Sequence, residues 1–150
     1  MKGTAASGGD ATTELAWLLR GALRAHRAAI AQALVKAGYE SLPPLALWAI
    51  DALAAGERSA GELAIRLGAS KQTISQLVEL LATRGYLERA PDRRDRRRVS
   101  LRLTGAGRAA ASTIARVCEN AEARAREEVG AEALEQARRV LAALRGPSAS

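Results

Sequence analysis

Arginines are the residues whose spacing most clearly suggests chemistry. Five of the six positions from Arg93 to Arg98 are arginine, and only Asp95 interrupts them. Like charges this close repel one another unless an anion or nearby carboxylates offset them. Asp92 and Asp95 can pair with these arginines and fix their direction, and oriented arginine suits a narrow, electronegative DNA minor groove. A lipid headgroup site and a solvated charged loop are the alternatives.

Earlier in the chain lies a set of polar residues that can read DNA bases. Apolar residues recur with helical period at Ile74, Leu77, Val78 and Leu81, which assigns them to the buried face of a helix. The opposite face carries Gln72, Gln76, Glu79 and Thr83, flanked by Lys71 and Ser75. In the major groove, glutamine can pair with adenine and glutamate can accept from the cytosine amino group. Because any amphipathic surface helix has a polar face, this pattern alone does not establish DNA binding.

The overall charge agrees with a polyanionic partner. The formal net charge is +7 and the isoelectric point is near 10.7, as in proteins that meet nucleic acid or an anionic membrane surface. No apolar run approaches the ~18 residues that span a bilayer, and the first residues lack the apolar core of a signal peptide. Cys118 is the only cysteine, so no internal disulfide can form. We therefore expect a cytoplasmic protein.

Residue types that support catalysis or metal binding are scarce. With one histidine and one cysteine, we expect no transition-metal site and no cofactor. Paired acids, a nucleophile with its base and a phosphate-binding loop are all missing from the sequence, so we predict that the protein is not an enzyme.

The polar helix is the second of two short helices that the sequence caps clearly. Ser59 and Glu62 match the capping box that starts a helix, and Gly68 ends it. Ser70 caps the next helix, which we predict to run to Arg84. Two capped helices joined by a tight glycine-containing turn form a helix-turn-helix.

A β-hairpin is predicted to follow. The period changes from helical to two, with strands at residues 87–90 and 98–103 that place Val99, Leu101 and Leu103 on one face. The arginine-rich loop joins these strands. We predict a winged helix-turn-helix DNA-binding domain over residues 42–104, because a short helix, a tight turn, a polar-faced helix and a basic hairpin follow one another. This order of elements favours nucleic acid over lipid as the partner.

Long helices are predicted to flank this domain. A first helix covers residues 12–37, a further helix lies at residues 45–55, and residues 105–145 form two more helices. The apolar faces of the helices at the two ends of the chain are too extensive to be buried within so small a domain. We therefore expect residues 12–37 and 105–145 to form the dimerisation region. A monomer whose end helices pack only on each other is the alternative. Residues 1–11 and 146–150 are predicted to be disordered tails. The expected fold class is mainly α with a small β-hairpin wing.

Several motifs resemble the MarR family of winged-helix transcription regulators, over roughly residues 15–144. They are Gly61–Gly68, Ser70–Leu81, Arg84–Arg89, and Asp92–Arg97 followed by Leu101–Thr104. The resemblance implies a homodimer whose first and last helices interleave, with recognition helices in successive major grooves and wings in the flanking minor grooves. It makes Arg94 the wing-tip arginine and Asp92 the acid that orients it. Gln72 and Gln76 depart from the family's usual residues, which affects base preference.

The resemblance also implies a ligand cleft between the dimerisation helices and the DNA-binding lobe, for small aromatic or lipophilic acids. Trp17, His26 and Trp48 are the candidate lining residues, although Trp48 can equally be core and His26 a packed or surface residue. Redox-sensing members carry the reactive cysteine in the first helix, and this first helix has none. Cys118 lies on the apolar stripe of a later helix, so we predict a buried, inert thiol.

We therefore predict a DNA-binding transcriptional regulator, a repressor that acts as a homodimer on a palindromic operator and that a small ligand can release. A low-specificity architectural DNA-binding protein is the alternative, and reuse of the domain for protein contacts is a third hypothesis. The predicted DNA contacts are Ser70, Lys71, Gln72, Thr73, Ser75, Gln76, Glu79, Asp92, Arg93, Arg94, Arg96 and Arg97.

Overall fold

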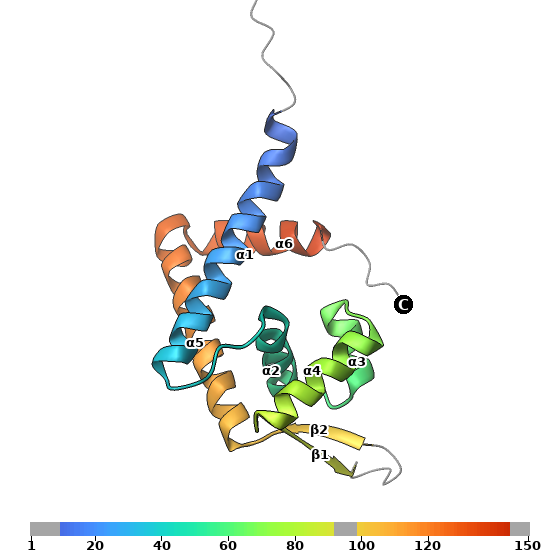
Figure 1. Cartoon of the computed structure of the whole chain (residues 1–150). Coiled ribbons are helices and arrows are strands. Elements are labelled where there is room, and N and C mark those ends of the chain that lie inside the picture. The colour runs from blue at the N-terminus through green and yellow to red at the C-terminus, as the bar shows by residue number, and fades with distance from the viewer. Residues whose placement is uncertain (1–9, 92–98, 145–150) are drawn as a thin grey trace, which may run out of the picture.

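The computed structural model describes residues 10–91 and 99–144. In these residues the chain forms six helices and one antiparallel hairpin (Figure 1). The elements are α1 (Asp10–Lys36), α2 (Pro44–Ala55), α3 (Ala60–Leu67), α4 (Lys71–Thr83), β1 (Leu87–Pro91), β2 (Val99–Leu103), α5 (Gly105–Val129) and α6 (Ala131–Leu144). The predicted fold class, mainly α with a β-hairpin, is confirmed. Helix α1 begins at Asp10, inside the predicted N-terminal tail of residues 1–11, so the tail was predicted two residues too long. Residues 1–9 and 145–150 are outside the described residues.

The helix-turn-helix forms through the caps that the sequence indicates. At the start of α3, the Glu62 backbone N–H donates to Ser59 Oγ (3.2 Å) and the Ser59 N–H donates to Glu62 Oε2 (2.9 Å). The backbone N–H of Arg58 also donates to this carboxylate and lowers the pKa of Glu62. Gly68 ends α3 in the left-handed conformation (φ 60°), which favours glycine. The capping box thus fixes the start of α3, and the left-handed Gly68 begins the turn to α4.

One core joins the helix-turn-helix to the hairpin and to α5. The predicted inner face of α4 is buried, as are Leu63 of α3 and Ile114 of α5. The largest fully buried side chains are Ile30, Leu34, Leu47, Ile50, Leu53, Leu63, Ile74, Leu81 and Ile114. Burying a side chain of this size stabilises the fold by about 1.5–3 kcal/mol. The core therefore holds α4 by its apolar face and leaves the other face outside.

The hairpin pairs Leu87 with Leu103 and Pro91 with Val99. Its β2 strand is tied to the rest of the domain because the Leu101 N–H donates to the carbonyl of Arg58 (2.7 Å). Leu101 and Leu103 are buried as predicted, but Val99 is 59% exposed. Val99 stands at the outer end of the hairpin opposite Pro91, beyond the part that the core covers, so the predicted apolar face is two residues long rather than three.

The first and last helices leave apolar side chains uncovered. In α1 only the C-terminal part of the predicted seam is buried, at Ile30 and Leu34, whereas Leu15 and Leu18 are exposed. The first turns of α1 stand clear of the other helices (Figure 1). No residue of α6 is buried. No helix among residues 10–91 and 99–144 has the length and apolar character that a membrane crossing requires.

Candidate nucleic-acid interface

The polar face of α4 is exposed along its whole length. Its exposed members are Lys71, Gln72, Thr73, Ser75, Gln76, Glu79 and Thr83. The residues between them are anchored in the core. A helix held by one face, with polar side chains standing on the other, can enter a major groove without rearranging the domain.

Ser70 and Thr73 hold the start of α4. Ser70 Oγ accepts the backbone N–H of Thr73 (3.1 Å) and lies 2.8 Å from Thr73 Oγ1. The capping bond fixes the first turn, whose free N–H groups and partial positive charge suit a phosphate. The two hydroxyls already bond each other, so a contact of either with DNA stays a prediction.

Glu79 has a protein partner that the sequence did not reveal. Arg89 Nη2, on β1, donates to Glu79 Oε2 at 2.9 Å. This ion pair joins the recognition helix to the hairpin across the turn at Gly85. Both side chains are largely exposed, so the pair adds at most ~1 kcal/mol to stability. The predicted contact of Glu79 with cytosine would compete with Arg89 for the same carboxylate.

The wing residues Asp92, Arg93, Arg94, Arg96 and Arg97 lie outside the described residues. Pro91 and Val99, which flank this segment, are paired in the hairpin. The two strands that carry the arginine-rich segment are thus anchored beside α4, and the predicted minor-groove role of the arginines stays a prediction.

Of the three candidate ligand residues, two come together. The rings of His26 and Trp48 lie 6.2 Å apart and nearly parallel, and both side chains are half-buried. Trp17 is 67% exposed on α1, with the Arg20 guanidinium 5.9 Å from its ring centre. It precedes His26 by nine residues, about 13 Å along the helix. A single chain therefore does not bring Trp17 to the other two.

A cavity of about 850 Å³ lies elsewhere, between α2, the hairpin and α5. Its walls combine charged side chains with small apolar ones: Asp51, Leu53, Ala54, Arg58, Glu88, Arg102, Leu103, Arg108, Ala111, Ser112 and Ala115. Arg58 Nη1 donates to the Leu53 carbonyl (3.0 Å), and Arg108 Nη1 donates to the Leu103 carbonyl (2.8 Å). Neutral carbonyls thus orient these two guanidinium groups without cancelling their charge. The sequence did not indicate this cavity because its walls come from three segments far apart in the chain.

Cys118 lies half-buried on α5, with its Sγ 3.3 Å from His26 Nε2. It is less buried than predicted. Burial raises the pKa of the Cys118 thiol, and the carboxylates of Asp51 and Glu122 raise it further. The thiolate is the reactive form, so this environment favours the inert thiol that the sequence predicts.

We expect iodoacetamide to alkylate Cys118 in the folded protein about tenfold more slowly than free cysteine near neutral pH. A raised pKa leaves less thiolate at a given pH, so the rate should climb to a midpoint above that of free cysteine. The control is the same reaction in denaturant, where the free rate should return. Equal rates in the folded and unfolded protein would contradict this prediction.

Comparison with known proteins agrees with this geometry. Residues 41–98, which span the helix-turn-helix, match the family model described as "MarR family". Among solved structures, a probable transcriptional regulator from Pseudomonas aeruginosa is similar over 87% of this chain and 96% of its own, with 25% identity and a TM-score of 0.66. A MarR family transcriptional regulator from Rhodococcus sp. RHA1 is similar over 95% and 99%, with 21% identity and a TM-score of 0.69.

CouR from Rhodococcus jostii RHA1, solved bound to p-coumaroyl-CoA, is similar over 93% of this chain and 96% of its own, with 23% identity and a TM-score of 0.70. No curated protein sequence matches the chain significantly.

The fold and the exposed face of α4 define a winged-helix DNA-binding protein of the transcription regulator class. Within that class, residues 41–98 match the MarR family model, and a solved MarR family regulator shares the fold over nearly the whole chain.

Proposed function

We propose that the protein represses transcription as a homodimer, with the two α4 helices in successive major grooves of a palindromic operator. The observation that carries this proposal is α4 itself, buried on one face and fully exposed and polar on the other. The net charge of +7 favours DNA as the partner. Residues 42–104 form the DNA-binding region, and the role places the protein in the cytoplasm with its DNA.

The uncovered helices support a dimer built from residues 12–37 and 105–145. Trp17 and Leu18 on α1 and Val140, Leu141 and Leu144 on α6 are large apolar side chains left in solvent. An exposed apolar surface of this kind marks a protein–protein contact.

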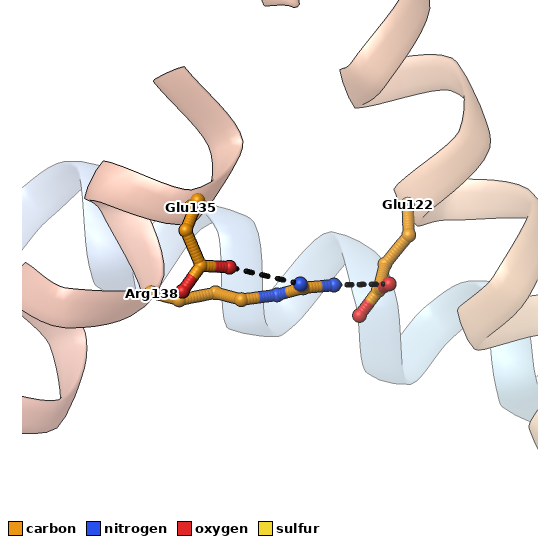
Figure 2. Close-up of polar contacts among 3 residues, drawn as sticks. All are labelled: Glu122, Glu135 and Arg138. Atoms are coloured by element: carbon orange, nitrogen blue, oxygen red, sulfur yellow. Dashed lines mark hydrogen bonds and ion pairs between the residues drawn. The ribbon is translucent and has the colours of Figure 1, made fainter. Parts of the chain in front are cut away.

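An ion-pair cluster holds α6 in position for this contact. Arg138 donates through Nη2 to Glu122 Oε2 on α5 (2.6 Å) and through Nη1 to Glu135 Oε2 on α6 (3.3 Å), as Figure 2 shows. All three side chains are about half exposed, so each pair adds at most ~1 kcal/mol to the packing of α6 on α5. Because no side chain of α6 is buried, the ion pair orients the helix while its apolar side stays free for a partner.

Two measurements test this proposal. Selection of bound sites from random DNA gives the sequence of the operator, and sedimentation of the protein and of its DNA complex gives the number of chains in each. We expect a dimer and a palindrome with half-site centres about one helical turn apart, bound at least ~10³-fold more tightly than random DNA. A dimer that binds all sequences equally would support the architectural alternative instead.

We expect Gln76→Ala to change base preference at one position of each half-site more than it changes total affinity. A bidentate glutamine–adenine contact discriminates by about 1–3 kcal/mol. Binding to duplexes with each base at that position measures the effect. Thr83→Ala, at the far end of the same exposed face, is the control and should leave base preference unchanged. Equal weakening on every sequence would refute the reading role of Gln76.

We further propose that a small aromatic or lipophilic acid binds in the cavity between α2, the hairpin and α5 and releases the DNA. Three arginines line it against two acids, Asp51 and Glu88, above a floor of small apolar side chains. Glu88 and Arg102 are register partners on the two hairpin strands, so a ligand that engages Arg102 acts directly on the wing. The bound p-coumaroyl-CoA in CouR supports a ligand-responsive role.

We expect at least one aromatic carboxylate from a panel of benzoates and cinnamates to release the DNA, and Arg102→Gln to lose this response. Fluorescence anisotropy of labelled operator measures the release. Arg139→Gln, on the outer face of α6, is the control of equal charge and should respond as the unmodified protein does. An unchanged response in Arg102→Gln would remove the cavity from the mechanism.

A further inference from the structure

The turn that leaves the recognition helix is a meeting point of three distant segments. Helix α4 ends at Thr83, Arg84 is its C-cap, Gly85 adopts a positive φ of 74°, and Tyr86 is buried before β1 begins. This junction, residues 84–86, touches the linker after α1 on one side and the start of α5 on the other.

The contact with the α1 linker depends on Arg84. Arg84 Nη1 donates to the Ser41 carbonyl at 2.7 Å, and Arg84 Nε lies 3.5 Å from Glu40 Oε2. The Arg84 side chain is 31% exposed, but that of Glu40 is 76% exposed, so the ion pair has the modest strength of a surface pair. Beside this contact, the ring centres of Tyr39 and Tyr86 lie 6.0 Å apart. The linker itself is fastened to α1, because the Tyr39 N–H donates to the Leu34 carbonyl (3.0 Å).

The contact with α5 is made by backbone and by one threonine. Thr104 Oγ1 donates to the Gly85 carbonyl (2.5 Å), and the Thr104 N–H donates to the Tyr86 carbonyl (3.1 Å). Gly107 lies so close that a Cβ atom there would stand 1.9 Å from the Tyr86 carbonyl oxygen. The α5 side of the junction is therefore rigid, and Arg84 provides the polar contacts of the α1 side.

We propose that Arg84 is a positioning residue that sets the angle of the recognition helix relative to α1 and α5, and thereby the half-site spacing that the dimer accepts. This inference rests on the proposed dimeric DNA binding. Helix α4 is about 20 Å long, so a tilt of about 5° at its C-terminal end moves its other end by about 1.7 Å. Two subunits tilting in opposite directions change the separation of their helices by about 3.4 Å, the rise of one base pair.

The alternative role for Arg84 is an ordinary contact with a DNA phosphate. A substitution of Glu40 distinguishes this role from positioning. Removing a phosphate contact weakens binding equally at every spacing, and neutralising a nearby acid strengthens it. Breaking a positioning contact instead relaxes the preference for spacing, whichever partner is removed.

The experiment uses the site that the unmodified protein selects from random DNA, and the same half-sites moved apart or together by one base pair. Affinities are measured for Arg84→Gln, Glu40→Gln, the double variant and Arg84→Lys, with Arg139→Gln as the control for lost charge. We expect the preference for the selected spacing to fall about two- to fivefold in each single variant, the range that an ion pair of this exposure supports. The double variant should match Arg84→Gln, because that substitution already removes the ion pair with Glu40 as well as the bond to the Ser41 carbonyl. Arg84→Lys keeps the charge but not the forked geometry, so it should keep overall affinity and lose spacing preference.

Three results overturn the inference. If Arg84→Gln weakens all spacings equally and Glu40→Gln strengthens them, Arg84 binds phosphate. If every variant keeps the spacing preference of the unmodified protein, the positioning role fails while dimeric DNA binding stands. If the unmodified protein has no spacing preference, the proposed function fails and this inference fails with it. Thermal melts show whether each variant is folded.

Discussion

Replacing Leu141 and Leu144 together with glutamate should convert the protein into a monomer and lower its operator affinity at least ~100-fold. Both leucines lie on the exposed apolar side of α6, and four buried charges at a symmetric contact oppose association strongly. A monomer loses the effective concentration that links the two half-sites, which is worth 10²–10⁴-fold. Sedimentation and operator binding measure the two effects.

The control for this experiment changes the same helix by the same charge. Arg139 and Ala142 are exposed on the opposite side of α6, so Arg139→Gln with Ala142→Glu should remain dimeric. Circular dichroism should show the core helices intact in both double variants, since α6 contributes no buried side chain. A dimer that survives the leucine substitutions would show that α6 lies outside the interface.

Replacing Gly107 with alanine should destabilise the fold by about 3 kcal/mol, since overpacking a close contact costs this much. The added Cβ would meet the Tyr86 carbonyl oxygen at 1.9 Å and a Leu103 methyl carbon at 3.1 Å, and a backbone atom cannot step aside as a side chain can. In a chain of this length the melting temperature should fall by about 6–12 °C.

Gly105→Ala is the matched control, two residues earlier in the same helix. A Cβ at Gly105 meets nothing within 4 Å, and alanine is the better helix former by about 1 kcal/mol. We expect Gly105→Ala to melt at or slightly above the temperature of the unmodified protein. If Gly107→Ala melted there too, the close approach of α5 to the junction would be wrong.

The features that the sequence predicted well are those that neighbouring residues decide. The capping box at Ser59 and Glu62 and the cap at Ser70 involve residues three positions apart. This spacing alone predicts the hydrogen bonds that start each helix. The buried face of α4 followed from periodicity, because a helix with one apolar stripe has one way to face a core.

Features that depend on distant or absent partners could not be predicted. The seam of α1 looks uniform in sequence, yet Ile30 is buried against its own chain while Leu18 is 62% exposed, because periodicity does not say which chain covers a face. The pair of Glu79 with Arg89 crosses a turn, and nothing in the sequence separates a carboxylate that reads DNA from one that an arginine holds. The cavity walls between Asp51 and Ala115 meet only through the fold.

The bare apolar side of α6 has a consequence for how the regulator responds to its own abundance. Fourteen residues are marginal as an isolated helix in water, so subunit pairing would stabilise α6 as well as assemble the DNA-binding form. Stability then depends on concentration, as it does for any state that only association stabilises. Below the dissociation constant of the dimer, operator occupancy would follow the square of the chain concentration. A modest change in synthesis or turnover would therefore switch the gene more sharply than a monomeric regulator could.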